Sequence, residues 1–479
     1  MRKVNPRSDF KGLTLSVAGL VVMMLVLSNA SPIRGQGAES QARHKKDEAK
    51  ELAMKITEPF TFAAVGDILA QRRPIGQLDD PRFQALMKVM RAADMTYANL
   101  EGQIINPSDP DYHGPQEPIG EWLPITIPED LKSMGIRVVT TANNQAMNAG
   151  SEAMFETNRL LDEAGITHAG TGKNLEDARQ PHFGDTPKGA IGVVGMFSID
   201  PTSNADRPVR FSNARDNTPG VNPIHLTPYN IVTAEQMASL RNIRDAVYAH
   251  RSEVLAPVAP VPANESLNQL TLFGTNYRVG DNVGSISYRM DAKDLVGIVQ
   301  SIRDGKQNSD FMIVAIHCHQ NSFSYQEYSH DNSEPDFLVE LAHQAIDNGA
   351  DVFVGSGVHT LRGVEIYKGK PIFYGLNSFF NVEISPTYTE YLNGIHQPDD
   401  LEVLLTTSRY EGGKLKEVRL YPADLGADDR PTSKVGIPMT PSPEQAQRTL
   451  KHLQEMSKQF GTIISIENGV GVINVAQTK

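Results

Sequence analysis

The sequence predicts an α/β fold organised around a largely parallel β-sheet. Short apolar runs, beginning with residues 60–65 and 95–98, alternate with amphipathic stretches that have the period of an α-helix. This alternation is typical of βαβ units, in which a helix connects two parallel strands. The chain has 479 residues, of which 39% are hydrophobic and 21% charged. It is therefore large and apolar enough to form an extensive core.

The sequence predicts loops, a hairpin, strands and helices along the chain. Residues 200–228 and 256–264 are rich in Pro, Asn or Asp and are predicted to be loops, so that residues 200–310 form an irregular insertion. Lys368-Gly369-Lys370 separates two apolar runs and predicts a hairpin. Residues 400–479 form a C-terminal extension of strands and one helix. We predict strands at 60–65, 95–98, 137–141, 190–197, 311–316, 351–354, 364–367, 371–374, 401–406, 418–421, 462–466 and 471–475, and helices at 82–93, 128–134, 151–164, 233–251, 334–348 and 443–458.

The N-terminus has the features of an export signal. Basic residues precede an apolar stretch at 13–27, and Ser28-Asn29-Ala30 provides small residues where a signal peptidase cleaves. This apolar stretch is shorter than the roughly 20 residues that a membrane-spanning helix needs. A cleaved signal peptide at 1–30 is therefore favoured over a membrane anchor. We expect a flexible linker at 31–58 and a folded domain at 59–479. The protein would be exported, and periplasmic, extracellular or membrane-anchored.

The net charge argues against general nucleic-acid binding, and the cysteine content rules out an internal disulfide bond. The formal net charge of −12 argues against a general nucleic-acid-binding protein, which usually has a basic face. An anionic ligand is still compatible, because a bound cation reverses the local charge. Cys318 is the single cysteine, which rules out an internal disulfide. We expect it to be a small buried residue rather than a nucleophile.

Five polar residues follow predicted strands, and this pattern predicts a ligand site. Ligands of open α/β sheets bind beyond the carboxyl ends of the strands, so we expect these side chains to meet at one edge of a single sheet. Each residue alone would equally suit a turn, a helix cap or a structural histidine. Together they form a mixed oxygen and nitrogen donor set that suits Mn, Fe or Zn. The metal-site candidates are Asp67, Glu101, Asn144, His317 and His359.

The ordered motifs around these residues resemble those of the CapA family of poly-γ-glutamate capsule biosynthesis proteins. The resemblance extends roughly from Phe60 to the C-terminus and lies in the order of the motifs. That family is similar to calcineurin-type metallophosphatases, which implies a four-layer α/β/β/α sandwich with one or two metal ions at the strand ends. The motifs include Gly66-Asp67-Ile68-Leu69, Asn99-Leu100-Glu101, Ala142-Asn143-Asn144, Gly355 to His359 and Lys370-Pro371-Ile372-Phe373-Tyr374.

Two motifs depart from the family pattern by losing histidines. Where the family has Asn-Asn-His, this chain has Asn143-Asn144-Gln145, and in metallophosphatases that histidine gives a proton to the leaving group. The resemblance therefore marks Asn143 and Gln145 as the catalytic positions, although Gln145 cannot exchange a proton near pH 7. The family's Gly-His-His-Pro-His is here Gly355-Ser356-Gly357-Val358-His359, which lacks two histidines, one of them an expected ligand.

A third departure adds a histidine. The family's His-Trp-Gly is replaced by His317-Cys318-His319. Side chains alternate along a strand, so His317 and His319 share a face if the strand continues, with Cys318 opposite. His319 is therefore either a replacement for a lost metal ligand or a solvent-facing loop histidine.

Three functions are compatible with these observations. The resemblance and the export signal imply a role in making, exporting or anchoring poly-γ-glutamate or a related surface polymer, with membrane-bound capsule synthesis machinery as partner. The donor set also suits a metal-dependent hydrolase of phosphate or amide bonds, whereas Gln145 favours a non-catalytic polymer-binding scaffold. The expected ligand is an anionic polymer or small anionic substrate, not nucleic acid. Arg72 and Arg73 either contact this substrate or are solvated loop residues.

Overall fold

A computed structural model of the protein describes residues 50–71, 79–106, 108–110, 112–113, 122–199, 214, 217–254, 266–323, 332–382, 401–426 and 434–477. The chain divides into two compact units, Met1–Lys50 and Glu51–Lys479, and the elements described below belong to the second unit. The predicted export segment at 1–30 lies outside the described residues. Among the helices of the described ranges, none is both long and apolar enough to cross a membrane.

The first large sheet combines parallel and antiparallel strands. Its strands are β1 Phe60–Ala70, β2 Met95–Leu100, β5 Ile136–Thr140, β6 Thr167–Ala169, β19 Ser378–Val382, β20 Glu402–Glu411, β21 Lys414–Asp424, β22 Ser465–Glu467 and β23 Val470–Asn474. The order is β22-β23-β21-β20-β1-β2-β5-β6, with β19 also paired to β1. β1 is parallel to β2 and β19 and antiparallel to β20. The C-terminal strands therefore complete this sheet instead of forming a separate extension.

The second large sheet has a parallel centre. Its strands are β8 His182–Thr186, β9 Gly189–Ile199, β11 Pro223–Val232, β12 Gln269–Leu272, β13 Thr275–Val279, β14 Ile286–Met290, β15 Phe311–His317, β16 Val352–Ser356, β17 Val364–Tyr367 and β18 Lys370–Phe373. The order is β12-β13-β11-β9-β15-β16-β18-β17, with β14 beside β11 and β8 beside β9. The hairpin predicted around Lys368 is confirmed, because β17 and β18 pair antiparallel.

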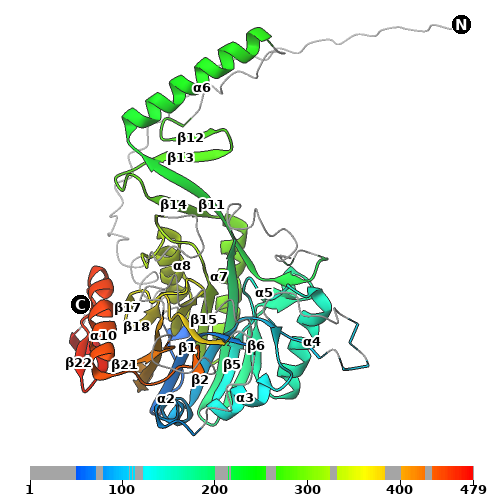
Figure 1. Cartoon of the computed structure of the whole chain (residues 1–479), viewed down its shortest axis with the longest axis vertical. Helices are drawn as coiled ribbons and strands as arrows, with labels where there is room; N and C mark the ends of the chain where they lie inside the picture. The colour runs from blue at the N-terminus through cyan, green and yellow to red at the C-terminus, as the bar shows by residue number, and fades with distance from the viewer. Residues whose placement is uncertain are drawn as a thin grey trace, which may run out of the picture. The chain divides into compact units, whose positions relative to one another are not determined.

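Helices cover the outer faces of the two sheets, which pack against each other (Figure 1). The longer helices are α2 Pro81–Ala92, α3 Ile127–Met134, α4 Gly150–Glu163, α6 Ala234–Val254, α7 Ala292–Asn308, α8 Asp336–Asp347 and α10 Pro443–Ser457. The core between the sheets joins Phe62 and Tyr97 of the first sheet to Val193 and Ile313 of the second. Residues of α2, α3 and α4 share a core with the first sheet, and those of α7 and α8 with the second. The predicted four-layer α/β/β/α sandwich is confirmed.

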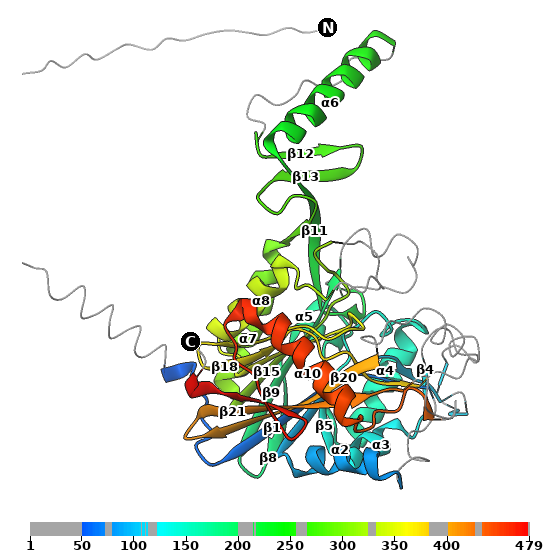
Figure 2. The same cartoon turned by 60° about the vertical axis from the view of Figure 1, so that its left-hand side comes forward.

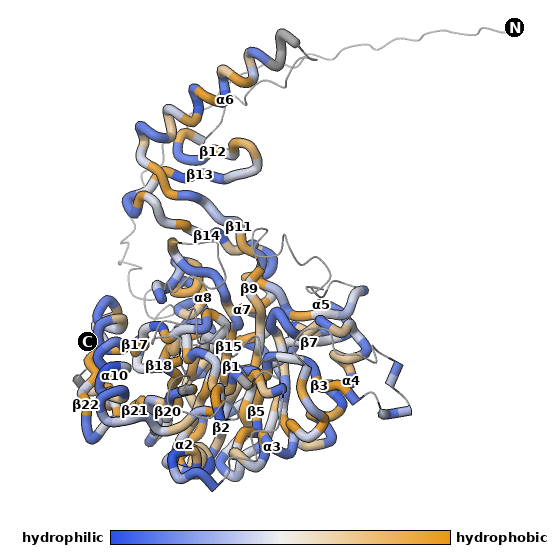
Figure 3. The backbone as a smooth tube through the Cα atoms, viewed as in Figure 1, coloured by the Kyte–Doolittle hydropathy of each residue, from blue (hydrophilic) through white to orange (hydrophobic). Residues whose placement is uncertain are grey.

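The central strands are apolar on both faces, because each is covered by a sheet on one side and by helices on the other. Phe62 and Ala64 of β1 belong to the core between the sheets, whereas Ala63 and Val65 belong to the helix-covered core. This arrangement explains the continuous apolar runs of the sequence. In Figure 3 these hydrophobic residues are orange along the central strands. α10 contacts β17, β21 and β23, and so touches strands of both sheets (Figure 2).

The region at 200–310, predicted to be irregular, contains regular elements. β11 begins at Pro223, inside the predicted loop at 200–228, and two prolines concealed its strand pattern. α7 has no counterpart among the predicted helices, although Asp291 caps it by accepting from the N–H groups of Lys293 and Asp294. Helix α6 confirms the prediction at 233–251. The predicted loop at 256–264 lies outside the described residues.

The folded unit begins before the predicted boundary at residue 59. Met54 and Ile56 are buried in the core between the sheets. Lys55 Nζ donates to the carbonyl oxygens of Gln307 at 3.0 Å and Ser309 at 2.9 Å, at the end of α7. Residues 51–58 are therefore part of the sandwich and not of a flexible linker.

Candidate metal centre

The candidate ligands come from both sheets. Asp67 lies within β1, Glu101 directly follows β2, and Asn144 lies between β5 and α4. His317 ends β15 and His359 follows β16, both in the second sheet. The prediction that these residues meet at the edge of a single sheet is therefore wrong. Asp67, Glu101, His317 and His359 meet where the carboxyl ends of the parallel strands of two stacked sheets come together, whereas no hydrogen bond among the described residues joins Asn144 to them.

Asp67 is reached by donors from both sheets. Its Oδ1 accepts a hydrogen bond from Asn99 Nδ2 at 2.7 Å and lies 3.3 Å from His317 Nδ1. Its Oδ2 accepts from the backbone N–H of Gly357 at 3.0 Å. Burial alone would raise the pKa of Asp67, but the charge and hydrogen bond of His317 help to lower it below the ordinary value of 3.8. Asp67 is therefore an anion in the folded protein.

Gly66 does not end the strand as the sequence suggested. β1 continues to Ala70, and its pairing with β19 shifts in register between Asp67 and Ile68. A Cβ atom on residue 66 would lie 1.7 Å from the carbonyl oxygen of Asn377. Glycine is required at this position because the two backbones approach so closely.

His317 and His319 face each other inside the protein. Their Nε2 atoms lie 2.8 Å apart, and their ring centroids are separated by 4.8 Å. His319 is only 5% exposed, so the alternative of a solvent-facing loop histidine is wrong. Cys318 packs on the opposite side in the core of the second sheet and its helices, as predicted. Two imidazole nitrogens this close require a proton or a cation between them, because two lone pairs would repel.

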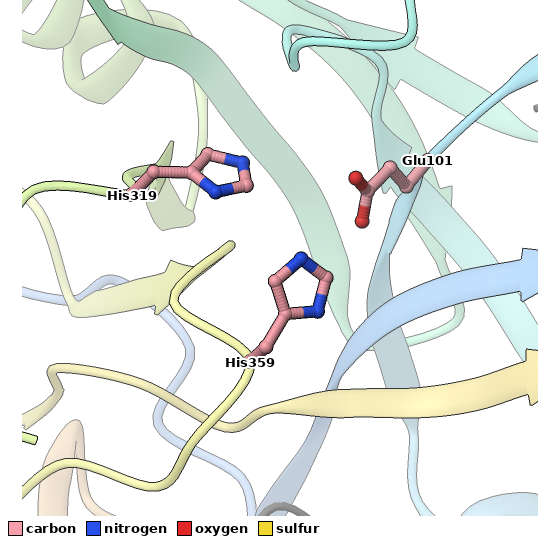
Figure 4. Close-up of side chains that lie close together, drawn as sticks. All are labelled: Glu101, His319 and His359. Atoms are coloured by element: carbon pink, nitrogen blue, oxygen red, sulfur yellow. The ribbon is translucent and has the colours of Figure 1, made fainter. Parts of the chain in front are cut away.

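Glu101, His319 and His359 converge on one point (Figure 4). One possible ligand atom from each lies within 4.8 Å of the other two. Asp67, Glu101 and His317 form a second group with the same spacing, so Glu101 belongs to both groups. Glu101 Oε1 also lies 3.7 Å from His317 Nε2. Carboxylates and imidazoles at these spacings fit a divalent transition-metal ion.

The loop after β5 contributes amide side chains. Asn144 is buried, and its Oδ1 has no hydrogen-bond partner among the described residues. Such an acceptor costs free energy unless a ligand or water satisfies it. Asn143 holds the loop, because its Nδ2 donates to Leu100 O at 2.8 Å and its Oδ1 accepts from Gln145 N at 3.0 Å. Gln145 Oε1 accepts from Asn148 Nδ2.

The conformation of the loop from Gly355 to His359 explains why one histidine of the family pattern is absent. Gly357 has φ +101°, and a Cβ atom there would lie 2.8 Å from Cys318 N and 3.0 Å from His317 Nε2. A histidine at 357 is therefore incompatible with this loop conformation. His319 places an imidazole beside the same nitrogen of His317. Relative to the family pattern, a histidine is lost at 357 and gained at 319.

His359 itself has an unusual backbone. Its φ is +59°, a left-handed conformation that costs a residue with a Cβ atom about 1–2 kcal/mol. Its Nδ1 lies 3.2 Å from Ser378 Oγ, a contact that fixes the ring orientation. Strained backbones of this kind cluster at functional sites.

A buried polar chain supports the ligands and was not among the predicted site residues. Thr140 Oγ1 donates to Asn99 Oδ1 at 3.1 Å and lies 2.6 Å from Tyr97 OH. Asn99 lies two residues before Glu101, so the alternation of strand side chains could have identified it. Arg72 and Arg73, the predicted substrate contacts, lie outside the described residues.

Comparison with known proteins places the chain in a family. The profile of the bacterial capsule synthesis protein family PGA_cap matches residues 61–382. The chain is 34% identical to the uncharacterized protein y4sH of Sinorhizobium fredii, covering 90% of this chain and 96% of that protein. It is 22% identical to the PGA biosynthesis protein CapA of Bacillus subtilis, over 70% of this chain and 66% of that protein.

Two further comparisons are more distant. The capsule biosynthesis protein CapA of Bacillus anthracis is 21% identical, over 75% of this chain and 66% of that protein. A putative 5'-nucleotidase from Staphylococcus aureus, solved with alpha-ketoglutarate, aligns with a TM-score of 0.37 and 11% identity, covering 83% of this chain and 58% of that chain. On the family match across most of the sandwich and the resemblance of its ordered motifs, this chain belongs to the bacterial capsule synthesis protein family PGA_cap.

Proposed function

We propose that the protein acts outside the cytoplasm in making, exporting or anchoring poly-γ-glutamate or a related anionic surface polymer, and that a divalent metal ion at the candidate centre is part of this function. The observation that carries the proposal is the burial of two carboxylates and two imidazoles, Asp67, Glu101, His317 and His319, in one cluster beside the half-buried His359. Burying so many ionisable groups is costly unless they bind a cation or each other.

The ligand chemistry favours Mn, Fe or Zn, with Glu101, His317, His319 and His359 among the residues that would hold the ion. Such an ion polarises carbonyl or phosphoryl oxygens and attracts anionic groups. The positive charge matters here, because a chain of net charge −12 would otherwise repel an anionic polymer. The protein's own residues orient the ligands and exclude water from the centre.

Gln145 bears on whether the protein is also a hydrolase. Its side chain is tied to Asn148 and cannot give a proton to a leaving group. The loss of a general acid typically costs about 10²–10⁴-fold in rate. Ordinary phosphoester turnover is therefore expected to be weak, which favours polymer binding or a specialised substrate. The retained ligand cluster supports a metal-dependent hydrolase of phosphate or amide bonds as the second candidate.

The proposal is tested in a capsule-forming bacterium that carries this gene. Deletion is expected to reduce the anionic polymer on the cell surface, and the wild-type gene to restore it. Glu101→Gln removes one carboxylate from the centre with little change in volume and is expected not to restore the polymer. Glu417→Gln, which alters a carboxylate remote from the site, serves as the matched control. Unchanged polymer in the deletion strain would contradict the polymer role, and full restoration by Glu101→Gln would contradict the need for the metal.

A further inference from the structure

We propose that Arg362 is a positioning residue of the metal centre, which directs His319 toward the ion by holding the residues on either side of it. This inference rests on the proposed metal centre and adds to it a residue that would not bind the ion itself. Arg362 was not among the predicted site residues. It lies three positions after His359, just before strand β17.

The Arg362 side chain is fully buried. It is only 1% exposed, and its backbone N–H donates to the carbonyl oxygen of Gly375 at 3.1 Å. A Cβ atom on residue 375 would lie 3.2 Å from Arg362 Cβ and Cγ, so glycine leaves room for the long side chain. Burying a guanidinium costs free energy unless hydrogen bonds replace its water. Its partners therefore indicate what the residue does.

Among the described residues, both hydrogen-bond partners of the guanidinium are neighbours of His319 in the sequence. Nη2 donates to the carbonyl oxygen of Gln320, and Nη1 lies 3.9 Å from Cys318 Sγ. The sulfur is a weak acceptor, which makes the Gln320 carbonyl the stronger contact. A guanidinium is a planar fork with donors at fixed spacing, so the two contacts together restrain the chain on both sides of His319.

This restraint acts where the strand no longer does. Strand pairing sets the direction of side chains only as far as His317, where β15 ends. His319 lies beyond the strand, yet its Nε2 is 2.8 Å from that of His317. It also groups with Glu101 and His359, as Figure 4 shows. Arg362 supplies an anchor for this position at the carbonyl oxygen of the next residue.

The positive charge of Arg362 is compensated by Glu334. Burial raises the pKa of Glu334 above the ordinary value of 4.5, and the charge of Arg362 opposes this rise. Glu334 Oε1 accepts from the backbone N–H of Gly363 at 2.7 Å, and its Oε2 accepts from Gln459 Nε2 at 2.8 Å. The guanidinium therefore has a counter-charge outside the candidate ligands.

Charge and position predict opposite effects of removing Arg362. A positive charge repels a bound cation, so its loss would tighten metal binding if charge were all that mattered. If Arg362 acts by position, its loss frees His319 and weakens binding. The sign of the change in metal affinity therefore distinguishes the two roles.

The experiment measures Zn²⁺ affinity of full-length variants by calorimetry, after metal has been removed with a chelator. Arg362→Met removes the charge and the donors, and is expected to bind Zn²⁺ about tenfold more weakly than wild type, as for other residues that orient a ligand. His319→Ala removes the ligand itself and is expected to weaken binding at least as much. The double variant should bind no more weakly than His319→Ala, because two residues that act as a unit are not additive. The Co²⁺ absorption spectrum of Arg362→Met should shift toward that of His319→Ala.

Lys306→Met is the matched control for the loss of a buried cation. Lys306 is 0% exposed and pairs with Asp351 at 2.7 Å, at the opposite end of β16 from the metal centre. This variant should lose stability but keep the wild-type Zn²⁺ affinity and Co²⁺ spectrum. A loss of affinity equal to that of Arg362→Met would show a general effect of destabilisation and would overturn the positioning role.

Arg362→Lys covers the case in which Arg362→Met does not fold. It keeps the charge but lacks the planar fork of donors, so its Zn²⁺ affinity should fall below that of wild type. Wild-type or tighter binding by either Arg362 variant, or additive losses in the double variant, would overturn the positioning role. Wild-type affinity in His319→Ala would overturn it too, while leaving the centre with its other ligands. Failure of the wild type to bind any metal would overturn the proposed centre itself.

Discussion

The Nε2 atoms of His317 and His319 lie 2.8 Å apart in the interior of the protein. One histidine ends strand β15 and the other lies just beyond it, so local strand geometry creates the pair. Phe197 of the neighbouring strand packs against both rings, at centroid distances of 5.8 Å and 6.5 Å. Phe197 therefore restrains both rings, and the Glu101 carboxylate, which follows a strand of the first sheet, lies beside His317.

Gln145→His should return a proton donor to the catalytic position of the family. We expect metal-dependent hydrolysis of a phosphodiester to rise by about 10²-fold over wild type, because a positioned general acid contributes about that much. Initial rates with an aryl phosphodiester and Mn²⁺ measure the effect. Gln145→Asn, which cannot transfer a proton, is the matched control. If both variants behave alike while still binding metal, the missing proton donor is not what limits the reaction.

Gly357→Ala should destabilise the protein even though only a methyl group is added. The left-handed φ of +101° and the contact at 3.0 Å with His317 Nε2 together predict a loss of about 1–3 kcal/mol in the free energy of unfolding. Urea unfolding with chelator present measures this loss. Gly369→Ala has a comparable φ of +76° but no atom within 4 Å of the added methyl group, and should cost less. Equal effects would show that the close contacts with Cys318 N and the His317 ring play no part.

His359→Gly should separate stability from metal binding. Glycine adopts the φ of +59° without the strain of a Cβ atom. Without metal, we therefore expect the free energy of unfolding to equal that of wild type or to exceed it by about 1 kcal/mol. The stabilisation by added Zn²⁺ should be smaller, because an imidazole is lost. Melting temperatures with chelator and with excess Zn²⁺ give both values. An undiminished Zn²⁺ effect would contradict a ligand role for His359.

Much of this arrangement could be predicted from the sequence, because the apolar runs and the polar residues after them are local patterns. The stacking of two sheets was predicted only by the family resemblance. The local patterns alone placed residues 67 and 317 at the edge of one sheet, because long-range packing is what brings them together. The side occupied by His319 depended on whether the chain stayed extended after β15. The incompatibility of a histidine at 357 depended on a positive φ angle, for which Gly357 was the only local signal.

Acid should weaken the contact between β6 and β8, which link the two sheets. The His168 and His182 rings lie 5.5 Å apart. Burial lowers the pKa of both below the ordinary value of 6.5, although Asp162 opposes this at His168, and Asp177 and Asp162 oppose it at His182. In the unfolded chain these two histidines take up protons more readily than in the folded protein. The stability that their burial as neutral rings allows is therefore complete above pH 6.5 and is lost as the pH falls below it.

The corresponding measurement is the urea midpoint at pH 7.5 and pH 5.5. Wild type should lose stability over this interval, and His168→Gln should lose less, because one buried proton acceptor is gone. His250→Gln removes a solvent-exposed histidine of α6 and should leave the pH dependence unchanged. Identical pH dependence in wild type and His168→Gln would show that these two rings do not control acid stability.

The location of the ion tests the account most directly. A crystal of the protein soaked in Zn²⁺ and measured at the zinc absorption edge should show an anomalous peak among Asp67, Glu101, His317, His319 and His359. No peak near any of these residues would contradict it.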